Sequence, residues 1–300
     1  MTLQKKYYGV IAPLVTPIDK KGKIDDAAVE NLFRYVMKDQ NFPFILGTTG
    51  EIALNPVTYR EHLAKLAGKI VNDKSTLYGG STEKCVENTV NTAKRYADYG
   101  VHVFVVHLPY FFPLTPDLMI KYFEYVADNS PKPIVIYNIK SITNMTIPID
   151  VIEKLSHHPN IVALKDSERD YDRVEKLAEK FKDREDFSLF IGWTNKSSQA
   201  LLLGFDGIIP NTSNVTPGLF QSLYQAAKKG DEQTAMQFQE RAETLSVLVQ
   251  NNKPMTRTIP EIKAILNHLN ICKPYVQMPL VPLTEDENKV LINEYSKLNL

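Results

Sequence analysis

The sequence predicts an α/β protein: a closed (β/α)8 barrel of the TIM type followed by a helical C-terminal extension. Short apolar runs alternate with amphipathic stretches along most of the chain, which is typical of parallel strands joined by helices. Eight such runs occur, and eight strands are the number that closes a barrel. The alternative is a doubly wound open sheet, but no Gly-x-Gly-x-x-Gly turn follows the first run.

Each expected strand is a short apolar run, as strands buried on both faces are. The eight runs are Val10–Val15, Phe44–Leu46, Thr76–Tyr78, Val103–Val106, Ile134–Tyr137, Ile161–Lys165, Leu189–Ile191 and Gly207–Ile209. The helices that follow them are expected at Asp25–Met37, Val57–Val71, Glu83–Tyr99, Pro116–Asp128, Ile149–Ser156, Asp170–Phe181, Lys196–Leu203 and Pro217–Lys228. Apolar residues at helical spacing support these helices, and Pro116 and Gly100 suit a first turn and a helix end.

The pattern of alternation ends after Gly230. Helices without intervening strands are expected at Asp231–Val249, Ile259–Leu269 and Glu285–Leu298. The sequence therefore predicts two domains, a barrel of residues 1–230 and a C-terminal helical domain of residues 231–300.

Composition narrows the function classes. The 300 residues include 35 basic and 35 acidic side chains, so no general attraction to nucleic acid or to an anionic membrane is expected. No apolar leader or membrane-length apolar stretch is visible, and we expect a cytoplasmic protein. Cys85 and Cys272 do not form a disulfide framework, and no His or Cys spacing resembles a metal site.

Lys165 directly follows the apolar run Ile161–Leu164. If its side chain points into the interior, the loss of hydration lowers its pKa. A neutral amine in a dry site can attack a ketone and form a Schiff base. The alternative is a surface lysine at the junction of a strand and a loop.

The carboxyl ends of barrel strands form the active face of such folds, and two of them carry suitable chemistry. In Gly47–Glu51 the glycines let successive backbone N–H groups form an anion nest, where Thr48 and Thr49 could bind a carboxylate and pass on protons. A tight turn with threonine caps is the alternative, and Glu51 is expected to support the loop rather than act as an acid. Tyr137 ends the strand before Lys165, so its phenol could transfer protons beside the amine, or it could be a core tyrosine.

The motifs Gly47–Glu51, Tyr137-Asn138 and Leu164–Ser167, in this order, resemble the dihydrodipicolinate synthase / N-acetylneuraminate lyase family over nearly the whole chain. The resemblance implies a homotetramer of barrels with C-terminal helices and no cofactor beyond a Schiff base on Lys165. It implies Tyr137 as the proton-transfer residue and a carboxylate site at Thr48 and Thr49. The resemblance also implies that Gly192 and Ile209 line the keto-acid pocket. Tyr110 and Asn195, at other strand ends, complete the predicted substrate site.

The sequence departs from the family at three positions. Ile142 stands where dihydrodipicolinate synthases carry an arginine for the second substrate's carboxylate. Phe111 replaces a tyrosine that those enzymes send into a neighbouring subunit. Thr194-Asn195 replaces the Asp-Glu pair of sialic acid lyases.

These observations favour a class I aldolase that cleaves or forms a 2-keto acid from pyruvate and an aldehyde, with a 2-keto-3-deoxy sugar acid as the expected substrate type. A dihydrodipicolinate synthase-like enzyme remains an alternative, because Lys140 could replace the arginine missing at Ile142. A Schiff-base dehydratase or decarboxylase is another. A non-catalytic keto-acid-binding protein is disfavoured, since binding alone would not need Lys165.

Overall fold

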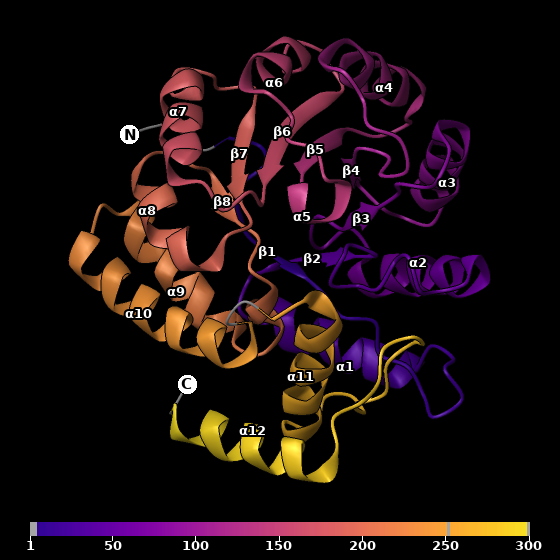
Figure 1. The fold of residues 1–300 in the computed structure, drawn as a ribbon, viewed down its shortest axis with the longest axis vertical. Helices are drawn as coiled ribbons and strands as arrows, with labels where there is room; N and C mark the ends of the chain where they lie inside the picture. The colour runs from indigo at the N-terminus through magenta and orange to yellow at the C-terminus, as the bar shows by residue number, and fades with distance from the viewer. Residues whose placement is uncertain (1–4, 251–252, 299–300) are drawn as a thin grey trace.

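The computed structural model describes residues 5–250 and 253–298. Strands β1 to β8 pair in chain order, all parallel, and β8 pairs back with β1, so the predicted closed barrel is confirmed (Figure 1). The strands are β1 Gly9–Pro13, β2 Phe42–Ile45, β3 Tyr78–Gly80, β4 Val103–His107, β5 Ile134–Asn138, β6 Ile161–Asp166, β7 Ser188–Ile191 and β8 Gly207–Ile208.

Helices surround this barrel on its outer side (Figure 1). They are α1 Asp26–Met37, α2 Val57–Val71, α3 Val86–Asp98, α4 Pro116–Asn129, α6 Ile149–Leu155, α7 Tyr171–Phe181, α8 Ser197–Leu202 and α9 Pro217–Lys228. Short helices not predicted as separate elements follow three strands at their carboxyl ends: α5 Lys140–Thr143, η1 Thr194–Lys196 and η2 Asn211–Asn214.

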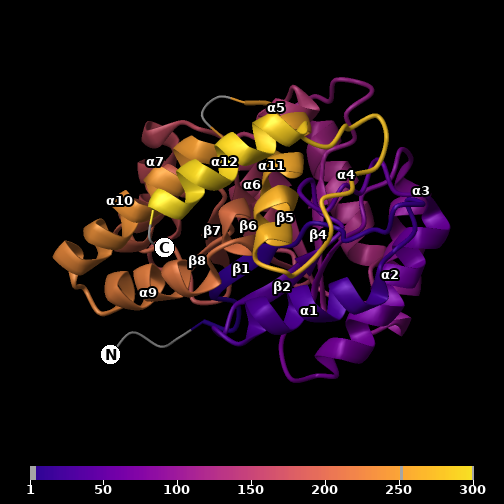
Figure 2. The same ribbon diagram turned by 90° about the horizontal axis from the view of Figure 1, so that it is seen from below.

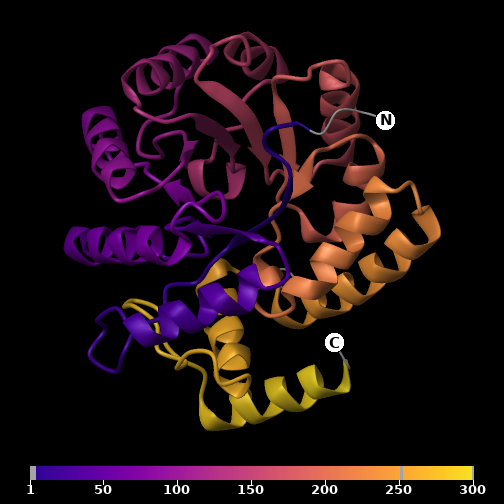
Figure 3. The ribbon, with the colours of Figure 1, turned by 180° about the vertical axis from the view of Figure 1, so that it is seen from behind.

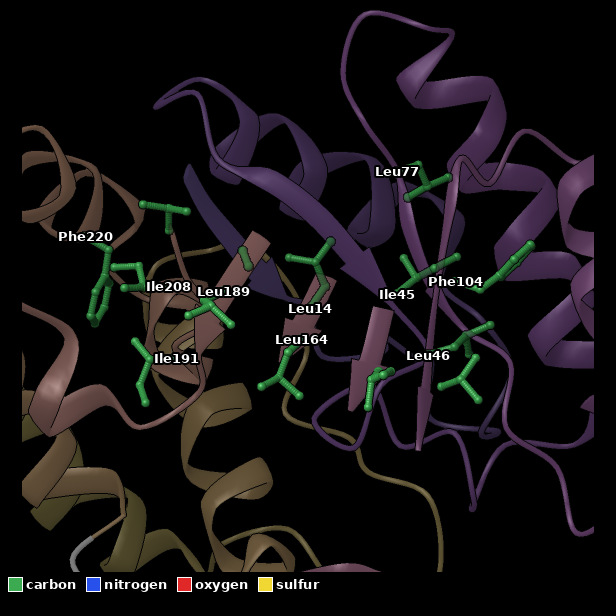
Figure 4. Packing of buried hydrophobic residues seen from close by; sticks show 14 of the residues in the cluster. Leu14, Ile45, Leu46, Leu77, Phe104, Leu164, Leu189, Ile191, Ile208 and Phe220 are labelled. Carbon is green, nitrogen blue, oxygen red and sulfur yellow. The ribbon is translucent and has the colours of Figure 1, made fainter. Parts of the chain in front are cut away.

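Alternation of side chains along the strands divides the core in two. One set points into the barrel and forms a cluster that includes Phe44, Val105 and Phe190. The other set points outward and packs under the helices, as Figure 4 shows for Leu189 and Ile208 near Phe220 of α9. Both faces are thus covered by apolar groups, which explains why these strands appear in the sequence as unbroken apolar runs.

The third strand is displaced from its predicted position. Thr76–Tyr78 was expected to be the strand and the glycines after it a turn, but β3 contains Gly79 and Gly80. A Cβ atom on Gly80 would lie 1.9 Å from the carbonyl oxygen of Leu46, so only glycine lets β2 and β3 approach this closely. The helix predicted from Glu83 also begins later, at Val86.

The C-terminal extension consists of helices packed on one side of the barrel. It contains α10 Glu232–Val249, α11 Met255–His268 and α12 Glu285–Lys297. Helix α10 lies along α9, and α11 lies against α12 (Figures 1 and 2). The view from behind shows α9 and α10 side by side again (Figure 3). The division into two domains at residue 230 stays a prediction.

Helix α11 begins at Met255, not at Ile259 as predicted, and contains Pro260 in its second turn. Proline has no N–H group, so the carbonyl of Thr256 loses its usual donor within the helix. Residues 258–266 of the helix are all buried, and this packing offsets the lost hydrogen bond. Within the part of the chain that the structure describes, no helix has the length and apolarity needed to span a membrane.

Candidate active site

His107, Tyr137 and Lys165 form one row across the inside of the barrel. His107 of β4 is the register partner of Tyr137 of β5, and Tyr137 is the partner of Lys165 of β6. Side chains alternate between the two faces of a strand, so each of the three points to the same face as the residue two positions earlier. Those earlier residues, such as Val105 and Ala163, point into the barrel. The row lies at the carboxyl ends of the three strands, where barrel enzymes carry their active sites.

Lys165 is buried, with 4% of its surface exposed. Its ammonium nitrogen lies 3.9 Å from the centre of the Tyr137 ring and 5.0 Å from that of Phe44. Burial lowers the pKa of Lys165, and the neighbouring Tyr137 only partly opposes this effect. The interior position predicted for the lysine is therefore observed, and its surroundings favour the neutral amine.

Asp166, the next residue, points to the outer face of β6 and is also fully buried. Its Oδ2 accepts hydrogen bonds from Arg173 Nε at 2.8 Å and from Asn138 Nδ2 at 3.0 Å. Burial raises the pKa of Asp166, whereas Arg173 and Asn138 stabilise the charged carboxylate. This charged pair ties β6 to β5 and α7, and so fixes the strand position from which Lys165 enters the barrel.

The loop after β2 is held in place by contacts from several directions. Thr16 donates a 2.6 Å hydrogen bond to the carbonyl of Gly50, and Glu51 closes the turn by donating from its backbone to Thr48. Glu51 has a φ of 57°, in the left-handed region where non-glycine residues are rare. Thr48 and Thr49 therefore occupy a constrained loop, and the carboxylate site expected there stays a prediction.

Glu51 forms a fully buried ion pair with Lys263 of α11. The side chains of both are 0% exposed, and Lys263 Nζ lies 2.6 Å from Glu51 Oε1. Lys263 also donates to the carbonyl of Tyr275 at 2.9 Å, and Gln277 N donates to Glu51 Oε2 at 3.3 Å. The expectation that Glu51 supports the loop agrees with this geometry, in which the C-terminal extension holds the Thr48-Thr49 turn.

A pocket of about 770 Å³ opens above Lys165. Thr48, Thr49, Tyr137, Gly192 and Ile209 line it, so the structure brings these predicted site residues together. A further wall comes from the C-terminal extension, including Gln250, Met255 and Thr258. No local signal in the sequence indicated that this extension faces the site.

Two predicted substrate-binding residues do not line this pocket. Tyr110 lies in the loop after β4 and is 45% exposed, and Asn195 lies in η1. At Gly192, by contrast, there is no room for a side chain, because a Cβ atom there would lie 2.0 Å from Ser167 Oγ. The wall of the pocket at β7 therefore consists of backbone.

Lys140 and Ile142 both line the pocket, at the position where the family pattern has an arginine nearby. Lys140 Nζ lies 3.2 Å from Glu168 Oε1. Burial would raise the pKa of Glu168, but hydrogen bonds from Asn138, Thr146 and Lys140 hold it below its ordinary value. The carboxylate of Glu168 is thus charged at neutral pH and compensates the charge of Lys140.

The described residues contain no group of three or more His, Cys, Asp or Glu side chains arranged to hold a metal ion. His102 and His107, at opposite ends of β4, point to different surroundings. His102 binds Asp73 and the backbone of Leu77, whereas His107 faces the site. The position of His107 beside the site was not predicted, because its neighbours there come from other strands.

Comparison with known proteins agrees with the fold. Residues 6–297 match the model of the Dihydrodipicolinate synthetase family. The chain is 28% identical to the 4-hydroxy-tetrahydrodipicolinate synthase of Staphylococcus haemolyticus (strain JCSC1435) over 292 residues, 97% of either chain. Its structure resembles a dihydrodipicolinate synthase from Bacteroides thetaiotaomicron (TM-score 0.93, 24% identity, 98% of this chain and 100% of that one). It also resembles a prophage protein of the dihydrodipicolinic acid synthase family from E. coli K12, solved with pyruvate (TM-score 0.92, 23% identity, 98% and 99% covered).

Replacing Lys263 by methionine should lower the free energy of unfolding by about 3–5 kcal/mol, because it leaves the Glu51 carboxylate buried without a counter-charge. The double variant Glu51→Gln/Lys263→Met should recover more than half of that loss. Chemical denaturation measures both, with Lys289→Met as the control, since Lys289 pairs with Asp286 at the surface. Equal losses in the single and double variants would show that the charge of Glu51 is not what Lys263 compensates.

Proposed function

Because the chain belongs to the dihydrodipicolinate synthetase family, we propose that Lys165 is its Schiff-base residue, acting on pyruvate. Members of this family are class I pyruvate-dependent carbon–carbon lyases, and they need no metal or other cofactor. The observation that carries the assignment to Lys165 is its burial among aromatic rings beside Tyr137. A desolvated amine is the nucleophile that attack on a ketone requires.

In the proposed reaction Lys165 attacks C2 of pyruvate as the neutral amine, once its ammonium has lost a proton, which the lowered pKa favours. Thr48 and Thr49 hold the carboxylate of the keto acid through their hydroxyls and the N–H groups of the loop. Tyr137 gives a proton to the departing hydroxyl, which leaves as water and produces the imine. In the cleavage direction the imine accepts the electrons of the breaking C–C bond, and Tyr137 removes the proton of the hydroxyl that becomes the aldehyde.

For the aldehyde we propose a neutral, hydroxylated partner, so that the substrate is a 2-keto-3-deoxy sugar acid. Ile142 cannot hold a carboxylate, and the charge of Lys140 is compensated by Glu168. The neutral polar side chains of Asn211, Gln250 and Thr258 lie along the same pocket. A dihydrodipicolinate synthase-like reaction would instead need a cation to bind the semialdehyde's carboxylate. Of the other cations that line the pocket, Lys253 is paired with Glu261, so Arg169 is the one that such a carboxylate would have to use.

Borohydride reduction in the presence of pyruvate should add one three-carbon adduct per chain, and peptide mapping should locate it on Lys165. Lys165→Arg should abolish the adduct, since a guanidinium stays protonated and cannot attack. Lys140→Arg is the matched control, because Lys140 lines the same pocket and is 59% exposed. An adduct on Lys140, or none in the wild type, would refute the assignment.

Substrate choice is tested by comparing kcat/KM for aspartate semialdehyde with that for glyceraldehyde, each with pyruvate. We expect glyceraldehyde to be preferred by at least about tenfold, because an unpaired carboxylate would lose a charge-assisted pair worth several kcal/mol. A tenfold preference for the semialdehyde would contradict this pocket assignment. In that case Lys140→Ala or Arg169→Ala should remove the preference, since both cations line the pocket.

We further propose that the chain forms a homotetramer. Tyr110, Phe111 and Phe112 are 45%, 81% and 71% exposed, and adjacent exposed aromatic side chains are typical of a contact surface. Light scattering at micromolar concentration should give about four times the 34.1 kDa of one chain. Phe111→Ser/Phe112→Ser should shift the mass toward smaller species, and a wild-type monomer would refute the proposal.

A further inference from the structure

The tautomer of His107 is fixed by its backbone neighbour. Its Nδ1 lies 2.7 Å from the carbonyl oxygen of Leu108. A carbonyl can only accept, so Nδ1 carries the proton in this contact and the neutral ring keeps Nε2 as an acceptor. The imidazole ring lies edge-on to the phenol ring of Tyr137, with 6.3 Å between the ring centres.

Two further contacts hold His107 in this position. Its backbone N–H donates to Thr82 Oγ1 at 3.0 Å, and its carbonyl accepts from the hydroxyl of Tyr122 at 3.2 Å. Thr82 follows β3 and Tyr122 belongs to α4, so two different elements fix the end of β4. The imidazole is therefore rigidly placed beside Tyr137.

His107, Tyr137, Thr48 and Thr82 line one small cavity of about 10 Å³. The rest of its lining is mainly apolar, including Phe44 and Val105. A cavity of about this size holds one water molecule when two to four polar groups can bind it. Thr48, Thr82, His107 and Tyr137 are the lining residues whose side chains can form hydrogen bonds.

Burial lowers the pKa of His107, the hydrogen bond to Leu108 opposes this, and the nearby charge of Lys165 lowers it further. The ring is therefore neutral at pH 7 and free to accept a proton. No carboxylate among the residues lining the cavity stabilises the imidazolium. A proton accepted by His107 will accordingly be returned readily.

We propose that His107, one water molecule in this cavity and Tyr137 form a proton relay that serves Lys165. The inference rests on the proposed imine chemistry and deepens it. When pyruvate binds, the ammonium of Lys165 gives a proton to the Tyr137 oxygen while the phenol proton passes through the water to His107 Nε2. The amine then attacks C2, and the carbonyl electrons move to oxygen. A proton passes from the attacking nitrogen to that oxygen, which gives the neutral carbinolamine.

The relay then runs in reverse. The imidazolium of His107 returns its proton through the water and Tyr137 to the carbinolamine hydroxyl. The C–O bond breaks, water departs and the nitrogen lone pair forms the iminium. One positive charge is present at the start, on the ammonium, and one at the end, on the iminium, so no other reactant is required. His107 acts through Tyr137 and is a positioning and relay residue rather than a group that touches substrate.

The test measures how fast the imine forms, by mixing protein with pyruvate and reducing with borohydride after set times. His107→Gln keeps a polar side chain but cannot shuttle a proton, so the rate should fall by about tenfold or more, at the low end of acid–base effects. The KM for pyruvate should change by less than about twofold, since Thr48 and Thr49 are untouched. His102→Gln, the same substitution at the other end of β4, should leave the rate unchanged.

A double variant separates the relay from a general loss of packing. If His107 acts only through Tyr137, then His107→Gln/Tyr137→Phe should be no slower than Tyr137→Phe alone. Multiplied effects of the two substitutions would overturn the relay, as would an imine rate in His107→Gln within twofold of the wild type. A wild type that is never trapped would overturn the imine chemistry itself and the relay with it.

Should His107→Gln fail to fold, the wild type still decides the question. Imine formation measured in mixtures of H₂O and D₂O should show a curved dependence on deuterium content, because several protons move together. A straight line, the result for a single proton in flight, would overturn the relay.

Discussion

The low polarity of the barrel interior is the constraint on which the site depends. Lys165 enters a space filled by Phe44, Tyr137 and other apolar groups, where an ammonium ion loses most of its hydration. The same strand keeps its other charged residue, Asp166, on the opposite face and pairs it with Arg173. Strand geometry thus separates an uncompensated amine from a compensated carboxylate one residue away.

The features that the sequence predicted are those decided locally. Apolar runs located the strands, and the ends of those runs located Lys165, Tyr137 and the Thr48-Thr49 turn. β3 was misplaced because its glycines are required by Leu46, which lies in another part of the chain. The start of α11 was misplaced because tertiary packing, which a local pattern does not contain, overrides the effect of Pro260.

Contacts between distant segments account for the rest of what was missed. The register that brings His107 beside Tyr137 depends on how β4 and β5 align, and the sequence gives no sign of it. Nor does any local pattern connect Glu51 with Lys263, or Lys140 with Glu168. Tyr110 and Asn195 lie near strand ends but do not line the pocket, and their part in substrate binding stays a prediction.

The ion pair of Glu51 and Lys263 affects the order in which the parts of the site form during synthesis. The two residues lie near opposite ends of the chain, yet the ion pair that holds the Thr48-Thr49 turn forms only when both are in place. During synthesis every strand of the barrel leaves the ribosome before Lys263 does. Until Lys263 has been synthesised, a nascent chain therefore lacks part of the support of its proposed keto-acid site. The Schiff-base chemistry proposed for Lys165 thus waits until the C-terminal helices have docked.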